Sequence, residues 1–197
     1  MHRSMARNLS LISLLVLSLL TATASAQTET IREADYSVKL FFVIGSDTET
    51  EGRELPSEFA AFRTRVAGEY GYKNLRLRDL QQGRVTSSGL TEIKGMSQMA
   101  GPGTQSDGPV FLEWAIRMQR EADPAKAAIG QFRVGIRVPI RSRAGGASGP
   151  VVNYEAVGMT ASGVSVPTGE PVLMGSLKLP EHDGTLFILL RVDEIQR

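Results

Sequence analysis

The chain has 197 residues, no cysteine, and 22 basic against 21 acidic side chains. This near-neutral balance gives no general electrostatic reason to bind nucleic acid or an anionic membrane surface. Without cysteine the chain forms no disulfide bond and carries no lipoprotein anchor, so the hydrophobic core has to hold the fold by itself.

Residues 1–26 have the three-part order of a secretory signal peptide. Two arginines precede an apolar run over residues 9–20, and a small-residue cleavage site, Ala-Ser-Ala, follows at 24–26. The apolar run is shorter than the about 20 residues of a membrane span. We therefore predict export to the periplasm or the medium of a Gram-negative type of bacterium, with no transmembrane segment after cleavage. The segment holds two of the basic residues and no acidic one, so residues 27–197 have a net charge of −1.

A strand and a helix are predicted first. Residues 36–44 are rich in β-branched and aromatic side chains and end at a Gly-Ser-Asp turn, which is typical of a strand. Pro56 suits the first turn of a helix over residues 56–70, and Gly71 suits its end. One apolar face of this helix is predicted to pack on a sheet; its residues recur at spacings of three and four: Phe59, Phe62, Val66 and Tyr70.

Two weaker strands and a long connection follow. Leu75 and Leu77 alternate with arginines, as in a half-buried strand. Residues 85–93 indicate another strand, which Gly89 interrupts. The glycine- and proline-rich residues 95–109 predict a flexible connection, the best candidate for a boundary. We nevertheless expect residues 27–197 to form a single domain, because each half alone would be marginal without disulfides.

The second half predicts a series of strands. Apolar residues of one parity run through 110–118 and again through 132–140, alternating with polar residues or glycine. Turn signals separate the further strands expected at 151–159, 163–166, 172–179 and 185–192. Short strands at such spacing are typical of a sandwich. The predicted fold class is α+β, a mainly antiparallel β-sandwich with one helix near the N-terminus.

The residues that could carry catalysis or hold a metal are few. His182 is the single histidine after residue 26 and lies in a turn, and no serine stands in a Gly-x-Ser-x-Gly elbow. The acidic residues of 47–54 lack the spacing of a calcium loop. Met96 and Met99 alone are too few for a copper site. We therefore predict no catalytic residue, no metal site and no cofactor.

Four arginines are the candidate partner-binding residues: Arg133, Arg137, Arg141 and Arg143. They share a parity, so the first two project from one face of the predicted strand and the others continue from its end. Such a row suits an anionic glycan, a phosphate or a protein partner, although charge on a sheet also serves to keep a solvent face soluble. The loop 141–150 is long for a hairpin, and long loops are often functional.

The last forty residues resemble the closing β segments of bacterial secretins. In secretins a turn of the type Gly-Glu/Gln-x-Val leads into a Gly-Gly-Leu strand, and a late apolar strand follows. Residues 168–177 (Thr-Gly-Glu-Pro-Val-Leu-Met-Gly-Ser-Leu) match that order with Ser176 in place of the second glycine, and 186–190 supply the apolar strand. Val110 to Met118 stands for a secretin core strand. The chain has no lip insertion and no row of amino-terminal ring domains, so the resemblance implies shared β-hairpins and not a pore.

The expected function is that of an exported, non-enzymatic protein that binds, or is a structural component among, other parts of the cell envelope. Two other interpretations stay open. A carboxylate-dependent hydrolase of envelope glycans or peptides would need two acids facing each other across a cleft. A small-ligand carrier would need a pocket of at least about 300 Å³. The sequence does not determine the partner or the oligomeric state.

Overall fold

The computed structural model describes residues 34–48, 51–97, 99, 108–142, 151–180 and 183–195. The predicted signal peptide, Arg143 and His182 lie outside these residues. The described residues belong to one compact unit, Glu33–Arg197.

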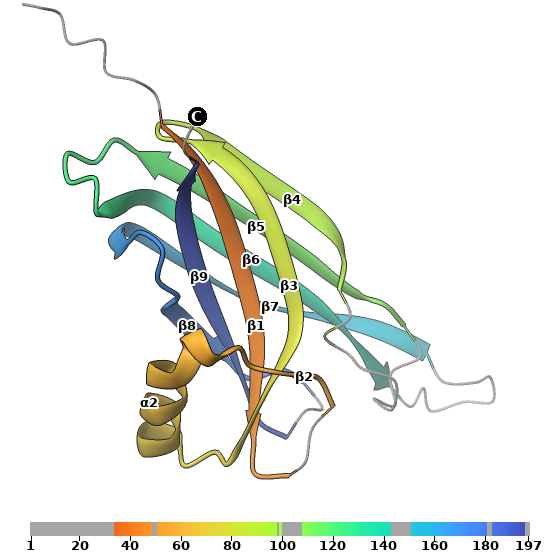
Figure 1. The fold of residues 1–197 in the computed structure, drawn as a ribbon. Coiled ribbons are helices and arrows are strands. Elements are labelled where there is room, and N and C mark those ends of the chain that lie inside the picture. The colour runs from red at the N-terminus through yellow and green to blue at the C-terminus, as the bar shows by residue number, and fades with distance from the viewer. Residues whose placement is uncertain are drawn as a thin grey trace, which may run out of the picture. The chain divides into compact units, whose positions relative to one another are not determined.

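Two antiparallel sheets make up this unit (Figure 1). The five-stranded sheet has the order β2-β3-β1-β9-β8 and the four-stranded sheet the order β4-β5-β6-β7. The predicted class, an antiparallel sandwich with one helix, is confirmed. Along the chain the elements are β1 (Asp35–Ser46), β2 (Arg53–Glu54), a 3-10 turn η1 (Ser57–Phe59), α2 (Ala60–Tyr70), β3 (Asn74–Thr86), β4 (Leu90–Ser97), β5 (Val110–Gln119), β6 (Lys126–Ser142), β7 (Val151–Pro167), β8 (Val172–Leu177) and β9 (Thr185–Ile195).

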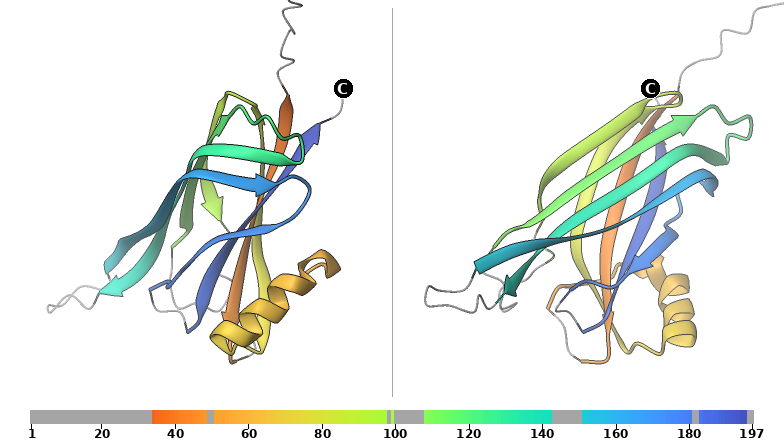
Figure 2. Two further views of the ribbon diagram at one scale, coloured as in Figure 1. Left: turned by 90° about the vertical axis from the view of Figure 1, so that its left-hand side faces the viewer. Right: turned by 180° about the vertical axis from the view of Figure 1, so that it is seen from behind.

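The main core lies between the two sheets, which face each other in Figure 2. Strand β5 buries one parity, from Val110 to Met118, and β6 does the same from Phe132 to Val138. This alternation is the predicted one. Trp114, the single tryptophan, is 1% exposed in this core. The polar parity of β5 and β6 therefore faces outward.

A second core lies under helix α2, on the other face of the five-stranded sheet. Strands β1 and β9 are buried on both faces: their alternate residues pack either on the other sheet or under the helix. Phe59, Phe62 and Val66 are buried there, as predicted, and Gly71 ends the helix with a φ of 75°. Tyr70 is 43% exposed, so the predicted apolar face ends one turn earlier.

Two strand predictions are wrong. Residues 85–93 are not one strand, because β3 ends at Thr86 and β4 begins at Leu90 in the other sheet. The turn between them, closed by the Gly89 N–H on the Thr86 carbonyl at 3.0 Å, carries the chain from sheet to sheet. Residues 151–159 and 163–166 are not two strands either. Gly163 adopts a φ of 64° inside β7, and pairing with β6 continues on both sides of it.

The predicted connection at 95–109 begins later than expected, because β4 runs to Ser97. Met99 is fully buried in the main core. Among the described residues, no helix combines the length and the apolar character needed to cross a membrane.

Candidate partner-binding face of the four-stranded sheet

The outer face of the four-stranded sheet is built by the residues that alternate with the main core. Strand register places them in rows across the four strands. One row contains Lys94, Glu113, Gly135 and Gly158. The next row contains Met96, Phe111, Arg137 and Ala156. Residues of one row point to the same face because paired strands keep a common pleat.

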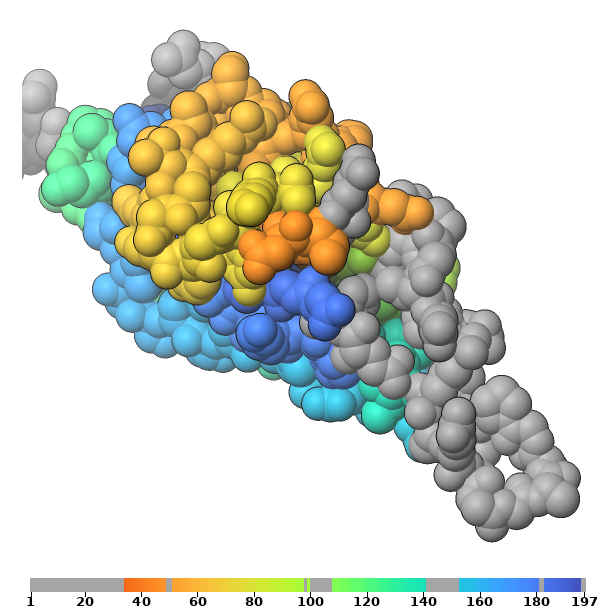
Figure 3. Space-filling view, turned by 90° about the horizontal axis from the view of Figure 1, so that it is seen from below, coloured from red at the N-terminus to blue at the C-terminus, as the bar shows by residue number. Residues whose placement is uncertain are grey.

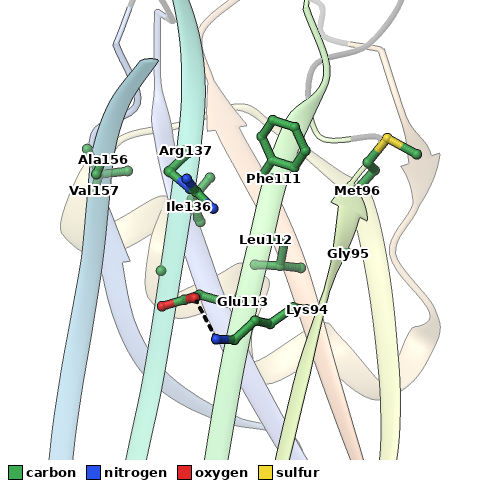
Figure 4. Close-up of a pocket in the computed structure, with 11 residues that line it drawn as sticks. Lys94, Gly95, Met96, Phe111, Leu112, Glu113, Ile136, Arg137, Ala156 and Val157 are labelled. Carbon is green, nitrogen blue, oxygen red and sulfur yellow. Dashed lines mark ion pairs between the residues drawn. The ribbon is translucent and has the colours of Figure 1, made fainter.

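A hollow of about 570 Å³ lies over these rows. Figure 4 shows Phe111 and Arg137 at one end and the Glu113–Lys94 pair at the other. Gly135 on β6 has no side chain, so the strand leaves space between the two ends of the hollow. Gly158, opposite Gly135, has no room for one, since an added Cβ would lie 2.5 Å from the Val134 carbonyl oxygen. Of these two glycines, Gly135 is the one that lines the hollow.

Four charges at one end of the hollow neutralise one another. The Lys94 ammonium lies 3.0 Å from a carboxylate oxygen of Glu92 and 3.7 Å from one of Glu113. The Arg133 guanidinium lies 3.5 Å and 4.0 Å from the same two carboxylates. The hydrogen bond from Lys94 lowers the pKa of Glu92, and the same bond raises the pKa of Lys94. Both groups therefore stay charged around neutral pH.

Arg137 occupies the other, more apolar end. Its guanidinium carbon lies 5.5 Å from the centre of the Phe111 ring, within cation–π range. The centre of the Phe111 ring in turn lies 5.5 Å from the centre of the Tyr154 ring, and Tyr154 is 42% exposed. In the described part of the chain no carboxylate forms an ion pair with Arg137. This end of the hollow thus combines apolar surface with one uncompensated positive charge.

The four predicted arginines do not act alike. Arg133 and Arg137 lie on the same outer face, as their parity requires, but Arg133 has two carboxylates beside it and Arg137 forms no ion pair in the part of the chain that the structure describes. The side chain of Arg141 and the whole of Arg143 lie outside the described residues. Sequence reasoning missed Phe111 and Glu113, although their opposite parity to the β5 core already placed them on the outer face.

The other candidates are scattered. Met96 is 72% exposed on the sheet face, whereas Met99 is buried in the core, so the two thioethers do not converge. The described carboxylates form no group of three that would suit a metal ion. Among the described acids of the 47–54 loop, Glu54 forms an ion pair with Arg76 at 3.6 Å.

Comparison with known proteins gives one type of match. No protein-family model and no curated protein matches the chain. Among solved structures, the secretin-domain β-barrel of InvG from the Salmonella SPI-1 injectisome matches with 13% identity and a TM-score of 0.36, over 98% of this chain and 69% of that one. InvG in its open-gate state matches with 13% identity and a TM-score of 0.38, over 98% and 66%.

The injectisome basal body of InvG, PrgH and PrgK gives 12% identity and a TM-score of 0.32, with 98% of this chain and 50% of that one covered. The chain thus weakly resembles secretins in structure as well as in its closing segments.

Proposed function

We propose that the chain is an exported, single-domain, non-enzymatic protein that binds another protein of the bacterial cell envelope. The binding surface is the outer face of the four-stranded sheet. The observation that carries the proposal is the contrast between two arginines four residues apart on β6. Arg133 shares the carboxylates of Glu92 and Glu113 with Lys94, whereas Arg137 lies over the Phe111 ring and forms no ion pair within the described residues.

The partner that fits this surface presents an apolar side chain next to a carboxylate. The apolar side chain would enter the hollow beside Phe111 and Ala156, over Gly135. The carboxylate would meet Arg137, whose planar guanidinium suits two parallel hydrogen bonds. Aromatic residues and arginine are also enriched among the residues that dominate binding energy at protein interfaces.

The hydrolase alternative finds less support in this hollow. Glycoside hydrolysis by two carboxylates needs one acid that holds a proton near neutral pH. Here both Glu92 and Glu113 lie beside Lys94 and Arg133, and the pKa of Glu92 is lowered. Fixed charges of this type favour recognition over proton transfer.

The experiment is site-specific photo-crosslinking in cells. A photoreactive amino acid replaces Ala156 at the rim of the hollow, and trapped proteins are identified by mass spectrometry. We expect a defined envelope protein, whose yield falls at least tenfold with Arg137→Gln. Arg133→Gln is the matched control on the same strand and face and should keep the crosslink.

Three outcomes would contradict the proposal. The crosslink could persist undiminished with Arg137→Gln, the two arginine variants could lower it equally, or no protein could be trapped. The last result, together with binding of a small apolar compound in the hollow, would favour the carrier alternative.

A further inference from the structure

A second hollow lies at the end of the unit where α2 leads into β3, the end that Figure 3 views. Its volume is about 300 Å³. Three cationic side chains from three different segments line it: Arg63 from α2, Lys73 from the turn after the helix, and Arg76 from β3. Glu54 of β2 is the acid in its lining. The hollow therefore gathers three positive charges and one negative charge.

The single acid compensates this charge poorly. Glu54 reaches Arg76 at 3.6 Å, but its side chain is 87% exposed, and such surface pairs contribute little. Arg63 donates a hydrogen bond to the Leu55 carbonyl, which orients the guanidinium without cancelling its charge. In the described part of the chain, Lys73 has neither an ion pair nor a hydrogen bond from its side chain. Two of the three positive charges, those of Arg63 and Lys73, therefore form no ion pair with a described carboxylate.

The segments that carry these charges are anchored. On α2, Phe62 precedes Arg63 and Val66 precedes Ala67, and both Phe62 and Val66 are buried between the helix and the sheet. Tyr72, which precedes Lys73, forms a 2.8 Å hydrogen bond between its hydroxyl and that of Thr185 on β9. The cations are therefore held close together although like charges repel, and an anion in the hollow would relieve that repulsion.

We propose that this hollow binds a phosphate group. A phosphate monoester carries about −1.5 to −2 charges at pH 7, which matches the two uncompensated cations. Arginine supplies a planar fork of donors and lysine a mobile point charge, and both are common phosphate ligands. The group belongs either to a soluble phosphate compound or to the headgroup of a membrane lipid. The two sources share the same chemistry at the site.

The test is an NMR titration of the purified protein with inorganic phosphate, at ionic strength held constant with sodium chloride. We expect saturable shifts of the amide signals from Lys73 to Arg76. Lys73→Gln should weaken binding at least tenfold and should leave the fold intact, because the residue is exposed and its side chain forms no hydrogen bond or ion pair within the described residues. Arg63→Gln should also weaken it. Arg65→Gln, on the same helix but outside the hollow, is the control and should bind as the wild type does.

Non-saturating shifts, equal shifts with chloride alone, or unchanged binding by Lys73→Gln would overturn the proposal. The source of the phosphate is distinguished by sedimentation with vesicles of phosphatidylcholine containing phosphatidic acid. Sedimentation that inorganic phosphate abolishes assigns the site to a lipid headgroup, and NMR binding without sedimentation assigns it to a soluble compound. The site is separate from Arg137, so Lys73→Gln should leave the crosslink at Ala156 unchanged.

Discussion

Replacing Phe187 by alanine should be among the most destabilising single changes in this chain. Phe187 lies on β9, is fully buried, and points under helix α2. Its ring centre lies 5.6 Å from that of Phe62, 5.0 Å from that of Tyr70 and 6.3 Å from that of Tyr72. A core Phe→Ala change costs about 3–5 kcal/mol. Because aromatic pairs add about 0.5–1.5 kcal/mol each beyond area burial, we place this site at the upper end, about 4–5 kcal/mol.

The matched control is Tyr70→Ala, which removes the same contact with Phe187 and the stacking on Tyr72 from a residue that is 43% exposed. It should cost about 1–2 kcal/mol, the value of two aromatic pairs with little burial. The assay is urea unfolding followed by two probes. Tryptophan fluorescence reports Trp114 in the core between the sheets, and far-UV circular dichroism reports the backbone. Coincident curves are expected from one cooperative unit.

Two results would refute this reasoning. A loss below about 2 kcal/mol for Phe187→Ala would fall outside the range for a truncated core aromatic ring and would show that the layer under α2 is loosely packed. Separate transitions by the two probes would show that this layer unfolds independently of Trp114.

Two further predictions concern α2 and the acid end of the pH range. Gly68→Ala should stabilise the protein by about 0.5–1 kcal/mol, since an added Cβ meets nothing within 4 Å at this helical position. Gly71→Ala should instead cost about 1–2 kcal/mol, because the φ of Gly71 is +75°. Urea midpoints measure both changes, and a shift of both midpoints in the same direction would refute this explanation. Burial raises the pKa of Asp193, but hydrogen bonds from Arg191 at 2.7 Å and Lys39 at 3.3 Å outweigh it and hold the pKa below its ordinary value. This stabilisation is complete above the unfolded-state pKa of about 4 and is lost as the pH falls through the folded-state pKa. Asp193→Asn should therefore make the free energy of unfolding depend less on pH on the acid side. A pH dependence parallel to that of the wild type would refute the assignment.

Local patterns in the sequence predicted the elements whose burial is periodic. Strand β5, and β6 from Phe132 to Val138, alternate because one face lies on the core and the other in solvent. Helix α2 was found from Phe59, Phe62 and Val66, which all pack on the sheet. The two errors, at 87–89 and at Gly163, have one cause: a glycine or a tight turn marks a change of backbone direction but does not say whether the pairing partner stays the same.

The candidate site was predictable only in part. Parity placed Arg133 and Arg137 on one face, but the difference between them depends on strand register. Glu92 comes from β4 and Glu113 from β5, and both reach Arg133 only because β4, β5 and β6 lie in that order. No local pattern contains this order, so the charge left over at Arg137 required the structure.

The pairing of the first described strand with the last affects how the chain folds. Asp35 lies opposite Ile195, and β9 is an interior strand of the five-stranded sheet, between β1 and β8. Closing the loop between Asp35 and Ile195 costs on the order of 4 kcal/mol in chain entropy before any contact forms. Folds dominated by such distant pairings form in milliseconds to seconds. Strand β9 supplies residues to both cores, so neither core is complete until the last described strand has joined the first.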